Sequence, residues 1–171
     1  MKINIQKTLK FKKNIQKSIL DISLIAGAKS AHIGGALSSV DLFSVLLEGI
    51  ANFNGSNFKE SSRDRIILSK GHACLVLYAS LIELGIIEKD LLKNFEGDNS
   101  DFAGHPIKNL NLGIEFSSGS LGMGLSYAVG LSIAFKRKNM NNKIFVIIGD
   151  GECNEGVVWE AIMSINHFNL N

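Results

Sequence analysis

Apolar residues along the chain follow two patterns, and each predicts a different kind of element. Short apolar runs, one within 63–69 and one at 144–148, are typical of parallel strands covered on both faces. Apolar residues at helical spacing predict helices over 15–26, 42–50, 73–84, 121–135 and 158–165, with a short one at 91–95. This alternation predicts an α/β fold with a mostly parallel sheet and helices on both faces.

The ends of these elements carry turn and capping signals. Ser38–Asp41 resembles a capping box that opens the helix at 42–50. Gly85 is expected to stop the helix at 73–84, whose nearly continuous apolar character predicts burial between layers. Asn154 or Glu152 is available to cap the last helix. No linker-like or repeated segment divides the chain, so residues 1–171 are expected to form a single domain.

The turn after the second predicted strand has the sequence Gly149-Asp150-Gly151-Glu152. Its glycines allow a sharp turn and close approach of a ligand, and its first carboxyl group lies at the carboxyl end of a strand, where α/β proteins bind ligands. A Gly-Asp-Gly turn by itself is equally consistent with a purely structural role, so its neighbours decide its meaning.

Three histidines lie in glycine-containing loops between predicted elements. His32 lies in the loop 28–36, His72 at a strand-to-helix turn, and His105 before a proline that keeps its loop extended. A single loop histidine is more often capped or solvated than catalytic. Three histidines in such loops make a ligand-binding or proton-transfer role the better interpretation.

The segment Gly119–Gly124 is glycine-rich and precedes a predicted helix, as phosphate-binding loops do. Its glycines run G-x-x-G-x-G, no Gly-Lys-Ser/Thr follows, and no long strand precedes it. A Rossmann or P-loop site is therefore excluded, and the small residues instead permit close packing.

Composition narrows the possible functions. The 171 residues include 46% hydrophobic residues, and the net charge of +2 is spread out, which argues against nucleic-acid binding. The lysines near the N-terminus are most simply a solvated helix face, with membrane-surface binding as the alternative. No membrane span or signal peptide is expected. Cys74 and Cys153 lack metal or redox spacing and are expected to be small buried residues of a reduced, cytoplasmic protein.

Five motifs occur in an order and at separations that resemble transketolases over nearly the whole chain. They are Lys29-Ser30-Ala31-His32-Ile33-Gly34, Ser69-Lys70-Gly71-His72, Ala103-Gly104-His105-Pro106, Ser118-Gly119-Ser120-Leu121-Gly122 and Gly149-Asp150-Gly151-Glu152. The segments 30–35 and 152–156 look most like the N-terminal subunits of transketolases split over two chains. The resemblance implies a thiamine-diphosphate-binding fold, here incomplete, and a dimeric or hetero-oligomeric enzyme of carbohydrate metabolism.

The resemblance implies a role for each matching residue. Asp150 corresponds to a ligand of the Mg²⁺ or Ca²⁺ ion that holds the diphosphate, which suits a hard cation. Catalytic roles are implied for His32, His105, His72 and Glu155, with His72 also contacting the cofactor and Glu155 linking two active sites. Further cofactor contacts are implied for Gly119, Ser120, Leu121, Gly149, Gly151 and Glu152.

The implied reaction is thiamine-diphosphate-dependent transfer of a two-carbon ketol unit from a ketose phosphate to an aldose phosphate. The family's metal motif continues beyond Asn171, so the sequence is expected to be truncated and to need a C-terminal subunit carrying the pyrimidine domain. Two alternatives remain open at this point. The chain could be part of a related thiamine-diphosphate ketol synthase, or it could be a non-catalytic fragment.

Overall fold

A computed structural model describes residues 3–27 and 31–170 of the chain. The first two residues of the Lys29–Gly34 motif lie outside the described residues. The α-helices are α1 (Ile5–Ala26), α2 (Ile33–Leu37), α3 (Val40–Val45), α4 (Cys74–Glu83), α5 (Met123–Arg137) and α6 (Gly156–His167), and the strands are β1 (Arg65–Leu68) and β2 (Ile144–Ile147). A π-helical turn continues α3 over Leu46–Ile50, and 3-10 turns cover Gly71–Ala73, Lys89–Asn94, Leu110–Leu112 and Gly151–Asn154.

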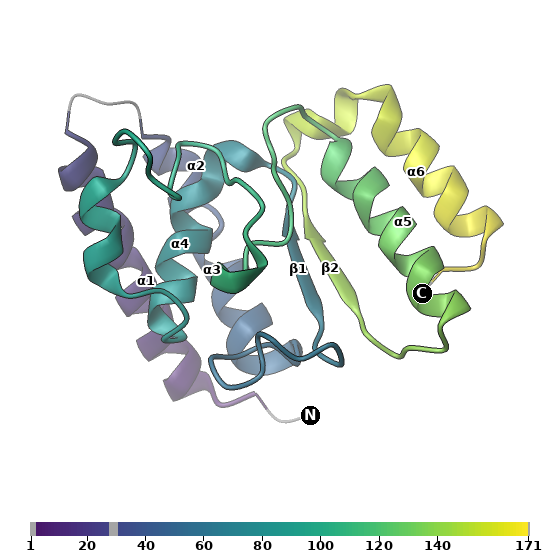
Figure 1. Ribbon diagram of the computed structural model, residues 1–171, viewed down its shortest axis with the longest axis horizontal. Coiled ribbons are helices and arrows are strands. Elements are labelled where there is room, and N and C mark those ends of the chain that lie inside the picture. Colours follow the sequence, from purple (N-terminus) through teal and green to yellow (C-terminus); the bar gives the residue numbers. More distant parts are fainter. Residues whose placement is uncertain (1–2, 28–30, 171) are drawn as a thin grey trace.

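The two strands run parallel and separate two groups of helices. Arg65 lies opposite Ile144 and Leu68 opposite Ile147. Helices α1 to α4 lie on one side of the strands, and α5 and α6 on the other (Figure 1). The predicted parallel pairing and the helices on both sides are confirmed. The described part of the chain is mostly helical, however, and its sheet contains two strands where a larger one was expected.

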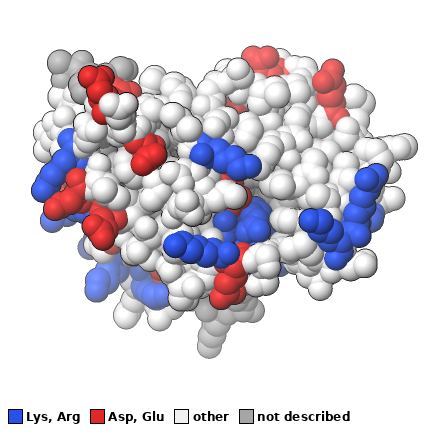
Figure 2. Space-filling view, in the orientation of Figure 1, with Lys and Arg blue, Asp and Glu red and all other residues white. Residues whose placement is uncertain are grey.

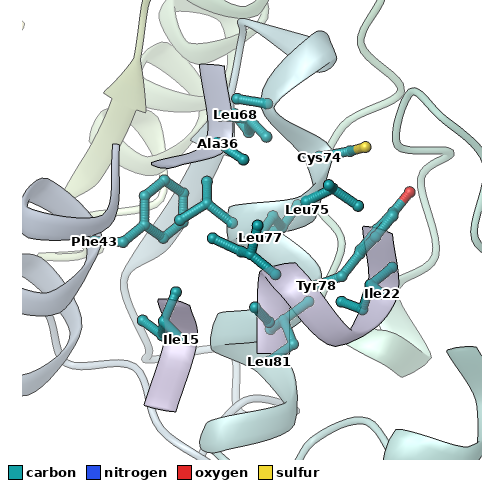
Figure 3. Packing of buried hydrophobic residues seen from close by; sticks show 14 of the residues in the cluster. Ile15, Ile22, Ala36, Phe43, Leu68, Cys74, Leu75, Leu77, Tyr78 and Leu81 are labelled. Carbon is teal, nitrogen blue, oxygen red and sulfur yellow. The ribbon is translucent and has the colours of Figure 1, made fainter. Parts of the chain in front are cut away.

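Helix α4 is the centre of the larger hydrophobic core. Every residue from Cys74 to Leu81 is buried, as its continuous apolar sequence predicts, and the helix ends before Gly85 in a left-handed conformation (φ 70°). One stripe of α1, including Ile15 and Ile22, packs against α4 together with Phe43 of α3 (Figure 3). Burying an aliphatic or aromatic side chain of this size contributes about 1.5–3 kcal/mol relative to leaving it exposed. This packing fixes the position from which β1 and its following turn emerge.

The core on the other face of the strands is smaller. It consists of Leu125, Val158 and Ala161, with partly buried residues of β2 against it. Within β2 only Ile147 is buried, so the prediction of a strand covered on both faces is wrong for 144–146. The reason is that β2 pairs with β1 alone among the described strands and has an uncovered second edge.

Two predicted helix caps are also wrong. The Ser39 hydroxyl donates a hydrogen bond to Gly35 O (2.9 Å), because the short helix α2 brings that carbonyl within reach, and it caps no N–H of α3. At the last helix, Asn154 donates to Gly151 O (3.2 Å) and Glu152 points away, so α6 begins without a side-chain cap. Helix α1 has a true cap, since Asn4 Oδ1 accepts from the Lys7 N–H (3.1 Å).

One helical run is longer and more apolar than the sequence pattern predicted. Residues Ile33–Ile50 have a mean hydropathy of 1.5 over 18 residues, enough by length and composition to cross a membrane. The run is broken into α2, α3 and a π-helical turn, and its Ala36, Val40 and Phe43 are buried against α1 and α4. These contacts are those of a core helix, which passes the same test.

Surface charge forms no continuous basic patch on the face shown in Figure 2. Lys and Arg side chains are interleaved there with Asp and Glu. Three described ion pairs at the surface of the helical layer involve Lys7 with Glu48, Lys12 with Asp41, and Lys89 with Asp21. This distribution agrees with the low net charge of the sequence and with solvated helix faces.

Candidate active site

The carboxyl ends of the two parallel strands bring the predicted site residues to one edge of the sheet. Residues Ser69–His72 follow β1, and Gly149–Glu152 follow β2. The turn at Gly119–Gly122 enters α5 at the same edge, since the Gly122 N–H donates to Glu152 and the Gly124 N–H donates to Ser69. This is the position at which open parallel sheets bind ligands.

Three histidines from three different segments meet there. The ring centroids of His32 and His72 are 5.9 Å apart, and those of His32 and His105 are 6.0 Å apart, with the rings edge-on in both pairs. His32 precedes α2, His72 lies in the 3-10 turn before α4, and His105 lies in the loop 103–106. His32 and His105 are exposed and His72 is half-buried. The structure thus brings together the three imidazoles that the sequence predicted as one site.

Glycines allow the histidine loops to approach this closely. A β-carbon on Gly35 would lie 2.9 Å from His72 Cδ2, and one on Gly71 would lie 2.7 Å from Ser118 Oγ and 2.9 Å from His105 Cδ2. Any larger residue at these two positions would therefore push a histidine or the Ser118 segment away.

Hydrogen bonds from α4 hold the His105 loop in place. The Tyr78 hydroxyl donates to Ala103 O (2.9 Å), and the Cys74 thiol donates to Gly104 O (3.1 Å). The Ser118 N–H donates to Pro106 O (3.1 Å) on the other side of the loop. His105 is therefore positioned by the core helix, although the imidazole itself faces solvent.

Burial and nearby positive charge act together on His72. Desolvation lowers the pKa of His72 below its ordinary value of 6.5, and Lys70, His32 and His105 lower it further, against a raising effect of Glu152. A neutral imidazole at neutral pH can accept a proton or a hydrogen bond from a substrate hydroxyl.

The turn after β2 exposes two of its predicted ligand residues. Asp150 is exposed, and a β-carbon on Gly151 would meet nothing within 4 Å, so both face open space. Glu152 is different: it is 1% exposed, and both carboxyl oxygens accept hydrogen bonds from within the protein. The side chain of Glu152 is thus occupied, and a ligand in this turn would meet Asp150 and the backbone.

The segment before α5 has the features of a ligand cradle. Gly119, Ser120 and Leu121 are exposed, and a β-carbon on Gly119 would meet nothing within 4 Å. Next to them, Ser118 Oγ is buried without a hydrogen-bond partner among the described atoms. A buried hydroxyl without a partner is costly and marks a place where a further polar group fits.

Metal binding is supported by one side chain only. The part of the chain that the structure describes contains no group of three or more His, Cys, Asp or Glu side chains arranged to hold a metal ion. The histidine trio is therefore not a metal centre, and the exposed carboxyl group of Asp150 could supply a single oxygen ligand.

Glu155 and the cysteines occupy less informative positions. Glu155 is exposed immediately before α6 and makes no side-chain cap, so its predicted link between two active sites stays a prediction. Cys74 is buried, and burial raises the pKa of its thiol to about 12, as for an inert core residue. Cys153 is exposed, contrary to the expectation that both cysteines are buried.

Sequence reasoning assigned no role to two buried serines of this site. Ser69 is part of a recognised motif, yet its hydroxyl joins Glu152 to the start of α5. Ser118 likewise belongs to a motif that gave it no role. Their small polar side chains directly after a strand and before a glycine-rich turn were the available signal.

An α/β protein with imidazoles, an acidic turn and a glycine-rich loop at one edge of a parallel sheet is typical of cofactor-dependent group transfer. The family model for the transketolase thiamine diphosphate binding domain matches residues 12–171. The chain therefore belongs to this family.

Individual relatives agree with the family match. The chain is 36% identical over 159 residues to an apulose-4-phosphate transketolase subunit of Actinobacillus succinogenes, covering 93% of this chain and 57% of the relative. It is 37% identical over 132 residues to the 6-deoxy-6-sulfo-D-fructose transketolase subunit SqwG of a Clostridium species, covering 77% and 48%. The chain thus spans about half the length of these relatives.

A solved structure shares the fold. The transketolase of Campylobacter jejuni superposes with a TM-score of 0.81 at 32% sequence identity, covering 92% of this chain and 26% of that protein. The two-strand sheet and its helices therefore correspond to part of the N-terminal domain of a transketolase.

Proposed function

We propose that this chain is the cofactor-binding subunit of a split transketolase, which transfers a two-carbon ketol unit from a ketose to an aldose. The observation that carries the proposal is the meeting of His32, His72 and His105 beside the Gly149–Gly151 turn. Bond cleavage next to a carbonyl needs proton transfer at the substrate oxygens, and clustered imidazoles suit this task at neutral pH.

The residues present fit thiamine diphosphate. Gly149, Asp150 and Gly151 would hold the diphosphate, with Mg²⁺ or Ca²⁺ on Asp150, and the exposed turn 119–121 would receive the aminopyrimidine ring. When bound, this cofactor supplies the carbon nucleophile that forms and breaks bonds to the ketose carbonyl carbon.

The chain's own residues would bind and orient the substrate and move its protons. His32 and His105 are exposed and can contact substrate hydroxyl and carbonyl oxygens. His72 is half-buried with a lowered pKa, so it is available as a neutral hydrogen-bond acceptor close to the cofactor turn. Lys70, whose side chain packs beside Gly149, adds positive charge at the same edge.

The names of the relatives support a class of substrates. One is named for apulose 4-phosphate and another for 6-deoxy-6-sulfo-D-fructose, which are both sugars with an anionic group. We therefore propose an anionic ketose, such as a sugar phosphate, as donor. The groups that would bind the anionic end are part of the proposal and are assigned to the partner.

A second chain is part of the same proposal. Two relatives are named as one lettered subunit of an apulose-4-phosphate transketolase, which supports a partner that brings the pyrimidine domain. Half of the site lies on this chain: the diphosphate turn, the ring-binding turn and three histidines. A cytoplasmic location is also proposed, supported by two free cysteines.

A non-catalytic fragment remains the competing function, and cofactor binding separates the two. Isothermal titration calorimetry with thiamine diphosphate and Mg²⁺ is expected to show saturable binding that disappears when EDTA removes the metal. A thermal shift that rises with cofactor concentration would give the same answer by mass action. Absence of both effects, in the chain and in its complex with a pyrimidine-domain subunit, would contradict the proposal.

A further inference from the structure

Helix α5 begins without a cap of its own. Its first residue is Met123, and Gly122 before it has a left-handed backbone (φ 79°) and no side chain. The first N–H groups of a helix have no partner within the helix and need an outside acceptor. The sequence around Gly122 supplies none, so the acceptors must come from elsewhere.

Two side chains from distant segments provide these acceptors. Glu152 Oε1 accepts from the Gly122 N–H (2.7 Å), and Ser69 Oγ accepts from the Gly124 N–H (3.2 Å). Ser69 Oγ also donates to Glu152 Oε1 (2.7 Å), which joins the two acceptors. Thirty residues separate Gly122 from Glu152, and 55 separate Gly124 from Ser69.

The second carboxyl oxygen of Glu152 binds the turn after β2. Glu152 Oε2 accepts from the Gly149 N–H (2.8 Å), and the Glu152 N–H donates to Gly149 O (3.1 Å). One carboxyl group, 1% exposed, therefore joins the end of β1, the end of β2 and the start of α5.

Close packing leaves this arrangement little freedom. A β-carbon on Gly122 would lie 2.6 Å from Val157 Cγ1, and one on Gly124 would lie 2.6 Å from Ser69 Cβ. The backbone of α5 thus lies directly on β1 and on the start of α6, and the Glu152 hydrogen bonds fix it in that position.

We infer that Glu152 is a positioning residue that, together with Ser69, holds the turn 119–121 at a fixed distance from the Gly149–Gly151 turn. This inference rests on the proposed function, because these are the two turns assigned to the aminopyrimidine and the diphosphate. Glu152 acts on the cofactor through backbone geometry. Holding both turns in place before binding saves the ordering cost that binding would otherwise incur.

The place of the diphosphate follows from the same contacts. Because Glu152 and Ser69 occupy the first amides of α5, the positive end of this helix is already used and cannot receive an anion. The diphosphate must then lie at the Gly149–Gly151 turn, where the Gly151 backbone faces open space.

Hydrogen exchange in the cofactor-free chain tests the cap directly. Glu152→Gln replaces Oε2 by a donor facing the Gly149 N–H, and Ser69→Ala removes the hydroxyl, so exchange within 119–124 is expected to speed up by about tenfold in each variant. Glu160→Gln on the exposed face of α6 is the matched control and should change nothing. Unchanged exchange in folded Ser69→Ala, or in folded Glu152→Gln, would overturn the inference.

Cofactor titration of the same variants tests the positioning role. Thiamine diphosphate with Mg²⁺ is titrated calorimetrically well below each variant's melting temperature, so that loss of fold does not contribute. We expect about tenfold weaker affinity for Glu152→Gln and for Ser69→Ala, less than additive when combined, and parental affinity for Glu160→Gln. Affinity within a factor of two of the parent in both single variants would overturn positioning.

The two arms separate the inference from the proposed function. If the parent chain and its complex with a pyrimidine-domain subunit bind no thiamine diphosphate, the proposed function fails, and positioning of that cofactor fails with it. The exchange result still decides whether Glu152 and Ser69 cap α5. If Glu152→Gln does not fold, Ser69→Ala, which keeps the carboxyl group, decides both arms.

Discussion

The three histidines share one site but differ in environment. His32 and His105 are exposed at loop ends, and His72 is half-buried with its pKa lowered by desolvation and by the neighbouring cations. The same residue type can therefore serve two purposes here. The exposed rings can follow substrate oxygens, and the half-buried ring is held neutral at the base of the site.

Removing either exposed imidazole should reduce catalysis and spare cofactor binding. For His32→Ala and His105→Ala, measured in the complex with a pyrimidine-domain subunit, we expect turnover to fall about 10²-fold to 10⁴-fold, as for lost acid–base groups. Steady-state kinetics and cofactor calorimetry measure the two effects. His167→Ala, in the exposed last turn of α6, is the control. Turnover within a factor of two of the parent would make His32 and His105 structural.

Asp150→Asn should weaken metal-dependent cofactor binding without altering stability. The side chain is exposed in the turn after β2 and takes no part in the core, whereas the amide is a much poorer ligand for a hard cation. Calorimetry with and without Mg²⁺ and thermal melts measure the two quantities. Asp98→Asn, at another exposed carboxyl group, should behave as the parent. Equal affinity of Asp150→Asn and parent would remove Asp150 from the metal site.

His72 should make stability depend on pH in one direction. Because its pKa is lower in the folded chain than its ordinary value of 6.5, the unfolded chain binds the proton more readily. The contribution of neutral His72 is therefore complete above about pH 6.5 and is lost as the pH falls through and below that value. Melting temperatures of the parent and His72→Gln across this range should show a smaller acid-induced drop in the variant. An equal drop in both proteins would contradict the assignment.

At the scale of elements, two glycines of the α5 region make opposite predictions. Gly122 has a positive φ, and a β-carbon there would meet Val157, so Gly122→Ala should destabilise by about 1–3 kcal/mol. Gly130 lies within α5 with nothing within 4 Å, so Gly130→Ala should stabilise by about 0.4–1 kcal/mol. Urea denaturation of both variants measures the difference. Equal effects would mean that the start of α5 is not constrained as described.

The elements also show how far sequence patterns reach. The continuous apolar stretch of α4 and the apolar run of β1 predicted burial well, because each carries its own signal. Helix α2 at Ile33–Leu37 was predicted as loop, since its two glycines are poor helix formers and its formation depends on packing against α1 and α4.

The candidate site was partly predictable for the same reason. His32, His72, His105 and the Gly149–Gly151 turn carry local motifs, and the structure brings them to one edge of the sheet. The role of Glu152 was not predictable, because it rests on contacts with Gly122 and Ser69, 30 and 83 residues away. Sequence patterns identify residues, but such long-range hydrogen bonds appear only once the fold is known.

At the scale of the whole molecule, the helical layer of α1, α3 and α4 carries most of the core, and the smaller layer of α5 and α6 carries much of the site. Apolar side chains on α6 remain exposed, notably Trp159, Ile162 and Met163. Together with a family whose relatives are about twice as long, this supports an account in which the chain works in association with a partner.

The most direct test of this account is a ketol-transfer assay with purified components. The 171-residue chain is assayed with thiamine diphosphate, Mg²⁺ and a panel of ketose and aldose phosphates, alone and after addition of a pyrimidine-domain subunit. The account predicts no transfer by the chain alone and transfer by the complex, lost again in His105→Ala. Ketol transfer by the chain alone, or none by a stably assembled complex, would contradict it.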